Sequence, residues 1–176
     1  MSGLRPVPAP CVVLGIDSAA TSGWARGAPR AHRFALDASG TCRTACQRRD
    51  VVTAAIARAA EMRVPLVVVA EDWAPHGMTP RTFGGLREAF GRWAEHLDLA
   101  ALPVVRVMPN RWRGALGLRA SGSDAWKRAA QLAVRARFGI EATADQAEAV
   151  CIAVYGAHSD EVLVELGRLE KRRGVA

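Results

Sequence analysis

The sequence predicts an α/β fold built on a mixed, five-stranded β-sheet flanked by helices. Two short, uninterrupted apolar runs, at residues 11–17 and 66–70, are typical of buried central strands. Two strand-like segments joined by a turn follow the first run, which indicates that the sheet begins with antiparallel strands. Segments with helical spacing of apolar residues then alternate with strands, as in parallel βαβ units.

The predicted elements follow in order along the chain. Strands are expected at residues 11–17, 24–28, 32–36, 66–70 and 104–107. Gly27, Pro29 and Arg30 are expected to form the turn between the second and third strands. Helices are expected at residues 44–62, 82–99, 109–117, 125–138 and 144–157. A charged, helical tail is expected at 159–176.

The length of 176 residues corresponds to one domain, with a core at about 11–157. A composition of 50% hydrophobic and 23% charged residues is that of a globular protein. No apolar run approaches the ~18 residues that span a bilayer, and residues 1–7 do not read as a secretory signal. We therefore expect a cytoplasmic protein with no membrane partner.

The chain is basic, with 24 Lys and Arg against 17 Asp and Glu and a net charge of +7. This balance favours a polyanionic partner, although an arginine- and alanine-rich chain also results from a GC-rich genome. Only Lys127 and Lys171 are lysines. Cys42 and Cys46 have no second cysteine pair near them, so a structural zinc site is not expected.

Four carboxylates lie at positions where burial of their charge would cost free energy. Asp17 directly follows the first apolar run and Glu71 the second, at the strand ends where open α/β sheets place ligand sites. Asp145 and Glu148 are spaced i, i+3 at the start of an apolar helix, on one face of it. Because that helix must pack on the sheet, we expect all four acids to converge.

Converging carboxylates repel one another unless a cation joins them. Hard divalent ions prefer oxygen ligands, so Mg²⁺ is the expected cofactor, with Mn²⁺ as a substitute. Two ions about 3.5–4 Å apart can activate a water and stabilise the leaving oxygen of a phosphodiester. The excess of arginine would then hold the DNA backbone.

Each acid also has a simpler structural interpretation. Asp17 could be a turn or cap residue, and one of the adjacent Glu71 and Asp72 could be solvated. Asp145 and Glu148 also favour the dipole of their helix. The combination of three such positions in separate elements nevertheless favours a metal site.

Three short motifs occur in order: Gly15-Ile16-Asp17 with Thr21-Ser22-Gly23-Trp24, Val69-Ala70-Glu71, and Ala144-Asp145-Gln146-Ala147-Glu148-Ala149. The segments 84–91 and 109–118, followed by Lys127, fit the same pattern. On these residues the sequence resembles the RuvC-like Holliday junction resolvases of the RNase H-like superfamily, and looks closest to phage and prophage members. The resemblance covers about residues 11–157 and implies an RNase H-like nuclease domain.

The resemblance implies four catalytic, metal-binding acids: Asp17, Glu71, Asp145 and Glu148. It also implies a homodimer, because symmetric cleavage of a junction requires two active sites, and Trp93 and Phe90 are candidates for the interface. Two departures from the family pattern stand out. Ser18-Ala19 replace the usual Pro-Gly after the first acid, and Glu148 stands where many relatives have Asp.

Six residues are candidates for contacts with DNA: Trp73, His76, Arg111, Arg113, Arg119 and Lys127. Trp73 could stack on an unpaired base or cover the edge of the core. His76 could touch the scissile phosphate or be an ordinary loop residue, and Lys127 could bind a phosphate or belong to a solvated face. The three arginines form the densest short basic cluster. Trp112 and Trp126 are expected to pack.

These features together predict a divalent-metal-dependent endonuclease that resolves branched DNA, above all four-way (Holliday) junctions. A nuclease of the same fold could instead cut RNA–DNA hybrids. A non-catalytic junction-binding protein would share the basic surface but would not need four acids. A sugar-kinase-like ATPase also begins with Gly-Ile-Asp but needs two such domains, so no nucleotide cofactor is expected.

Overall fold

The computed structural model describes residues 11–19, 21–30, 33–73 and 78–173. Within these ranges, no helix has both the length and the apolar character required to cross a membrane.

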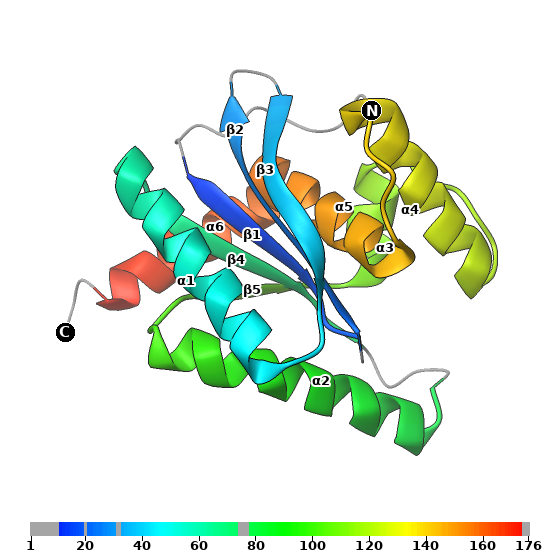
Figure 1. Cartoon of the computed structure of the whole chain (residues 1–176), viewed down its shortest axis with the longest axis horizontal. Coiled ribbons are helices and arrows are strands. Elements are labelled where there is room, and N and C mark those ends of the chain that lie inside the picture. The colour runs from blue at the N-terminus through cyan, green and yellow to red at the C-terminus, as the bar shows by residue number, and fades with distance from the viewer. Residues whose placement is uncertain (1–10, 20, 31–32, 74–77, 174–176) are drawn as a thin grey trace.

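The strands form one sheet in the order β3-β2-β1-β4-β5. β1 (Val12–Asp17) pairs antiparallel with β2 (Ser22–Arg30), which pairs antiparallel with β3 (Arg33–Cys42). On its other side, β1 pairs parallel with β4 (Leu66–Glu71), and β4 pairs parallel with β5 (Val104–Val107). The predicted mixed sheet of five strands is therefore confirmed (Figure 1).

The antiparallel strands are longer than predicted, and the expected turn was wrong. Gly27, Pro29 and Arg30 lie within β2, and the residues that connect β2 to β3 fall outside the described part of the chain. The pairing of β1 with β2 ends at the pair Val13–Gly27. Pro29 therefore lies where β2 has no partner on the β1 side, so its missing N–H costs no hydrogen bond toward β1.

Six helices are found in the described residues: α1 (Ala45–Met62), α2 (Pro80–Leu99), α3 (Pro109–Ala115), α4 (Ser123–Phe138), α5 (Ala144–His158) and α6 (Asp160–Arg173). α2 begins two residues before the predicted start because Pro80 suits the first turn of a helix and the Thr79 hydroxyl caps that turn. α6 lies in the segment where a helical tail was expected.

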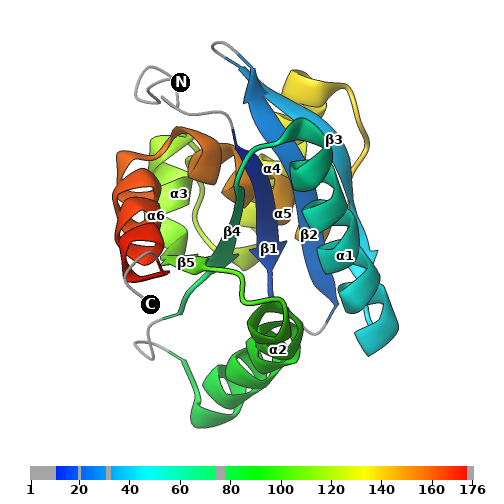
Figure 2. The same ribbon diagram turned by 90° about the vertical axis from the view of Figure 1, so that its left-hand side faces the viewer.

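Helices cover both faces of the sheet (Figures 1 and 2). Alternate residues of β1 point to opposite faces: Val13 packs with α5, whereas Leu14 and Ile16 pack with α1 and α2. Trp93 of α2 is fully buried in this second layer. The expectation that Trp93 forms a dimer interface is therefore wrong, because its ring belongs to the core. Phe90 is half-buried, with the Arg106 guanidinium 4.0 Å from its ring centre.

α5 is the most deeply buried helix, and every residue from Ala147 to His158 is buried. Two glycines allow it to lie directly on the sheet. A Cβ at Gly15 would lie 2.5 Å from the Ala149 carbonyl oxygen, and one at Gly23 would lie 1.8 Å from the Asp145 carbonyl oxygen. Because no side chain larger than hydrogen fits at these contacts, the two glycines determine where the start of α5 lies relative to β1 and β2.

Candidate active site

Three of the four predicted acids form a compact cluster at the C-terminal end of the central strand, β1. Asp17 is the last residue of β1, and Asp145 and Glu148 lie in the first turns of α5. Each of the three offers a carboxylate oxygen, and these oxygens all lie within 4.8 Å of one another. We call Asp17, Asp145 and Glu148 the acid triad. All of its ligand atoms are oxygens, which is the donor set that a hard divalent cation prefers.

The start of α5 is held firmly in place beside the sheet. Gln146 and Thr143 form a capping box, in which each side chain accepts a hydrogen bond from the other residue's backbone N–H. The Gln146 amide also donates to the Ser39 hydroxyl on β3, at 2.9 Å. These bonds, together with the close contact at Gly23, orient Asp145 toward Asp17.

Glu71, at the end of β4, is held differently. The indole N–H of Trp73 donates to its Oε2 at 3.1 Å, and that of Trp112 donates to its Oε1 at 3.0 Å. The carboxylate is buried, and each of its oxygens accepts a bond from one tryptophan. Trp73 therefore covers the edge of the core and binds Glu71, while its stacking on a base remains a prediction.

Two basic side chains from the predicted DNA-contact set lie among the acids. Arg113 Nη2 lies 3.0 Å from Glu148 Oε1 and 3.9 Å from Glu71 Oε1. Lys127 Nζ lies 3.8 Å from Asp145 Oδ1. Arg111 and Arg119 are exposed, and His76 lies outside the described residues.

The pKa values of the acids are raised because the carboxylates are buried next to one another. Burial raises the pKa of Asp17 well above its usual value, and the charges of Glu71, Glu148 and Asp145 add to this, against a lowering by Lys127. Burial also raises the pKa of Glu148, which Arg113 opposes.

For Glu71, burial and the charge of Glu148 raise the pKa to about 7, although the bond from Trp112, the charge of Arg113 and the bond from Trp73 all lower it. The acids are therefore short of positive charge. Since a carboxylate in this state gains most from a cation, the chemistry of the triad and Glu71 fits a divalent metal ion.

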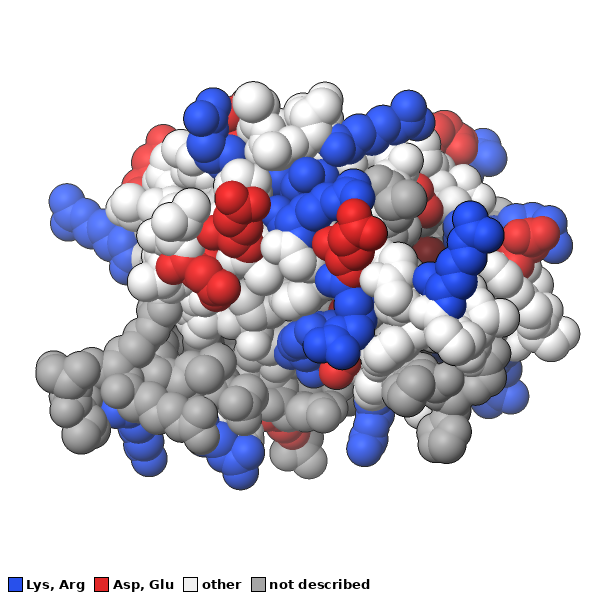
Figure 3. Space-filling view, turned by 90° about the horizontal axis from the view of Figure 1, so that it is seen from below, with Lys and Arg blue, Asp and Glu red and all other residues white. Residues whose placement is uncertain are grey.

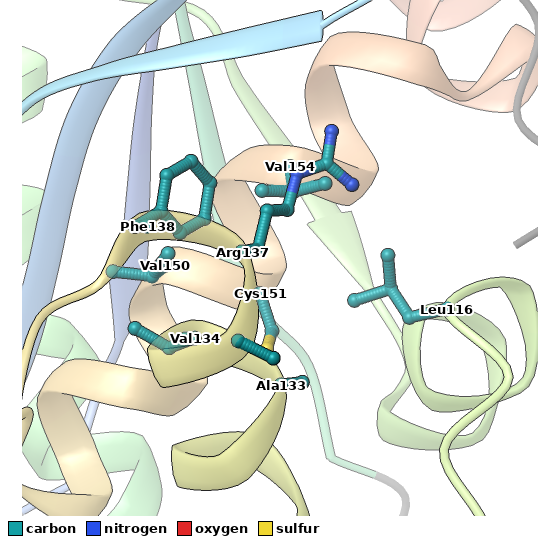
Figure 4. A pocket seen from close by; sticks show the side chains of 9 residues that line it. Leu116, Ala133, Val134, Arg137, Phe138, Val150, Cys151 and Val154 are labelled. Atoms are coloured by element: carbon teal, nitrogen blue, oxygen red, sulfur yellow. The ribbon is translucent and has the colours of Figure 1, made fainter.

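A separate cavity of about 460 Å³ lies between α4 and α5 (Figure 4). Its walls are largely apolar, with Val134, Phe138, Val150 and Cys151 among them. None of its lining residues belongs to the acid triad. Among the residues described, Arg137 is the charged residue in its wall and no carboxylate lines it, so it offers no site for a metal ion.

Sequence reasoning missed the role of Trp112. The residue was expected to pack, and it is fully buried, yet its indole N–H also binds an acid 41 residues away in the chain. No local pattern signals this contact, because it arises from the packing of α3 over the end of β4. Trp73 carried a weak signal, since it follows Glu71 by two residues.

Comparison with known proteins gives no match to a protein-family model and no match among curated proteins. Among solved structures, Thermus thermophilus RuvC is similar, with 20% identity over 89% of this chain and 96% of that one and a TM-score of 0.59. RuvC of the same organism in complex with a Holliday junction substrate has 19% identity, coverage of 90% and 96%, and a TM-score of 0.56. The chain therefore has the RuvC-type, RNase H-like fold that its motifs implied.

Proposed function

We propose that this chain is a divalent-metal-dependent endonuclease that resolves branched DNA, with four-way junctions as its main substrate. The observation that carries the proposal is the acid triad, whose oxygens lie within 4.8 Å of one another at the C-terminal end of β1. A RuvC structure of the same fold is bound to a Holliday junction, which supports the choice of substrate. A junction-binding protein without catalysis would have no need of buried acids that repel one another.

The proposed cofactor is Mg²⁺, or Mn²⁺ in its place, with two ions per site. Oxygens of Asp17, Asp145, Glu148 and Glu71 would hold them, and bound ions of this kind activate a water and stabilise a leaving oxygen. The chain's own part is to hold these carboxylates in place and orient them. The two indole donors on Glu71 and the capping box before Asp145 do this before any DNA arrives.

The proposed DNA contacts are those of Trp73, His76, Arg111, Arg113, Arg119 and Lys127. Arg111 and Arg119 are exposed at the two ends of the segment that includes α3, so their guanidinium groups can reach phosphates. The net charge of +7 supports a polyanionic partner. On the face seen in Figure 3, basic side chains gather near the centre with acidic ones beside them.

We also propose a homodimer located in the cytoplasm. Resolution of a junction requires paired cuts on two strands, which a single active site makes less readily than two. Because Trp93 lies in the core, other residues would form the interface.

The test is cleavage of a synthetic four-way junction, a linear duplex and an RNA–DNA hybrid, each with Mg²⁺, Mn²⁺ or EDTA. We expect paired nicks in the junction alone, lost in EDTA and lost in Glu71→Gln. Asp72→Asn is the matched control, because Asp72 is the neighbouring acid but pairs with Arg106 at 2.6 Å, outside the triad.

Two outcomes would contradict the proposal. Cleavage of the RNA–DNA hybrid in preference to the junction would indicate a different nuclease of this fold. Tight binding of the junction without cutting in either metal would indicate a binding protein.

A further inference from the structure

A second cavity lies beside the acids, and nothing in the proposed chemistry uses it. Its volume is about 430 Å³. Trp73 after β4, Met108 to Gly114 around α3, and Trp126 near the start of α4 contribute to its walls. We call it the α3 cavity.

The α3 cavity shares two wall residues with the active site. Trp73 donates its indole N–H to Glu71, and Arg113 contacts Glu148 at 3.0 Å. A group inside the cavity is therefore separated from the acids by single side chains. For a nuclease, the group next to the reacting phosphate is the adjoining nucleotide.

The walls suit a flat aromatic ring with polar edges. Trp73 and Trp126 contribute indole rings, each with a guanidinium group over one face, and Met78 and Met108 contribute polarizable thioethers that adapt to a ring face. Asn110 offers an amide that both donates and accepts, as the edge of a base requires.

Arg113 adds a donor with no present use. Its Nε is buried and finds no hydrogen-bond partner within the described part of the chain. A buried donor without an acceptor is costly, so a shift of the Arg113 side chain that brings Nε to an acceptor in the cavity would be favourable. Base edges carry carbonyl and ring-nitrogen acceptors of this type.

We propose that the α3 cavity receives one unstacked nucleobase from the DNA strand whose backbone lies on the acids. A base within a duplex cannot reach the cavity, because its faces are covered by its neighbours. Extrusion costs least where pairing is already disturbed, as at a branch point. The inference rests on the proposed function, and it would make the cavity a source of preference for branched over linear DNA.

The test is a binding scan with abasic nucleotides placed one at a time around the branch of a four-way junction, in EDTA so that DNA is not cut. For the wild-type chain, we expect a loss of affinity of roughly fivefold or more at one or two positions. This corresponds to the lower end of the roughly 5- to 150-fold that stacking on an aromatic side chain contributes.

Gly114→Leu adds bulk at the cavity wall and completes the test. Gly114 lines the cavity, and a Cβ built on it meets no atom within 4 Å, so a side chain can begin there without moving the backbone. We expect this variant to bind the intact junction about fivefold more weakly and to be insensitive to the abasic nucleotide that weakens wild type. Gly91→Leu, at an equally open position in α2, is the matched control and should respond like wild type.

Trp126→Leu, which removes a ring instead of adding bulk, should likewise abolish the response at the same abasic position. The cavity proposal alone would be overturned if the chain binds and cuts junctions but no abasic position lowers its affinity. It would also be overturned if the abasic nucleotide weakens binding equally in wild type and Gly114→Leu. Failure to bind or cut any junction would overturn the proposed function, and the cavity proposal with it.

Discussion

Asp17 and Glu71 occupy equivalent places at the ends of neighbouring parallel strands, yet their surroundings differ. Both side chains are buried, and both have raised pKa values. The strongest influences on Asp17 beyond burial are three other carboxylates, and Lys127 is the cation that opposes them. Glu71 instead has an indole donor on each oxygen and Arg113 nearby.

These surroundings show two ways in which a buried carboxylate can be stabilised at an active site. The chain itself compensates Glu71 in part, through two indole donors and Arg113, and these contacts hold its position without a metal ion. Asp17 is surrounded by like charge, so an external cation is the partner that relieves it. We therefore expect a bound metal ion to lower the pKa of Asp17 more than that of Glu71.

The largest expected effect comes from neutralising each acid in turn. Asp17→Asn and Glu71→Gln should both lower cleavage by about 10³-fold or more, roughly 4 kcal/mol in the barrier. Their metal-free stabilities at pH 8 should differ in size. Asp17→Asn should raise the melting temperature by removing repulsion, whereas in Glu71→Gln the gain from removing a charge is offset because an amide N–H₂ would face an indole donor. Calorimetry of both variants checks this, and an equal rise in both would remove the distinction.

The next effect is a dependence of stability on pH. With the pKa of Glu71 raised from 4.5 to about 7, the folded chain holds a proton that the unfolded chain has lost. Metal-free stability should therefore fall as pH rises from about 4.5 through about 7, by an amount on the order of 3 kcal/mol.

Urea unfolding from pH 4 to 8 measures this fall, with Glu71→Gln as the reference that lacks the titrating group. Because bound metal requires ionised ligands, Mg²⁺ should raise the melting temperature more at pH 8 than at pH 5.5. A larger effect of Mg²⁺ at the lower pH would contradict the assignment.

A smaller effect is expected from Trp112→Phe, which keeps the packing and removes one donor from Glu71. A hydrogen bond to a charged group contributes about 1.5–3 kcal/mol, so stability should fall by that order. The loss should grow as pH rises through about 7, because the ionised carboxylate accepts a stronger hydrogen bond than the protonated one.

Trp93→Phe is the control for this prediction. Trp93 is also fully buried, but its Nε1 has no hydrogen-bond partner among the residues described. Its loss of stability should be independent of pH in this range, and its cleavage rate should be close to that of wild type. Identical pH profiles for the two variants would show that Trp112 acts by packing alone.

The smallest effect is expected from Lys127→Met. The Lys127 side chain is 42% exposed and its Nζ lies 3.8 Å from Asp145, so solvent screens the pair. Stability should change by less than about 1 kcal/mol, and cleavage should fall only a few-fold. Lys171→Met removes the chain's other lysine, far along α6, and should leave cleavage rates unchanged.

Local pattern in the sequence was sufficient for most of the fold. The apolar runs before Asp17 and Glu71 predicted both central strands, and the i, i+3 spacing of Asp145 and Glu148 predicted a shared helix face. The hairpin was mispredicted because Gly27 and Pro29 are turn formers by composition. Their place in β2 depends on how far β2 pairs with β3, where Gly27 lies opposite Leu36 and Pro29 opposite Phe34, and that is a property of the assembled sheet.

The sequence by itself determined which acids stand at strand ends and helix starts, because burial periodicity is a local property. Only the tertiary structure decided what surrounds them. α3 brings Trp112 and Arg113 to Glu71, which is 41 and 42 residues away in the chain. The contact at Gly23 sets how closely the backbone of Asp145 packs on the sheet. These relations depend on distances between segments far apart in the chain. Packing sets such distances, and no spacing within one segment encodes them.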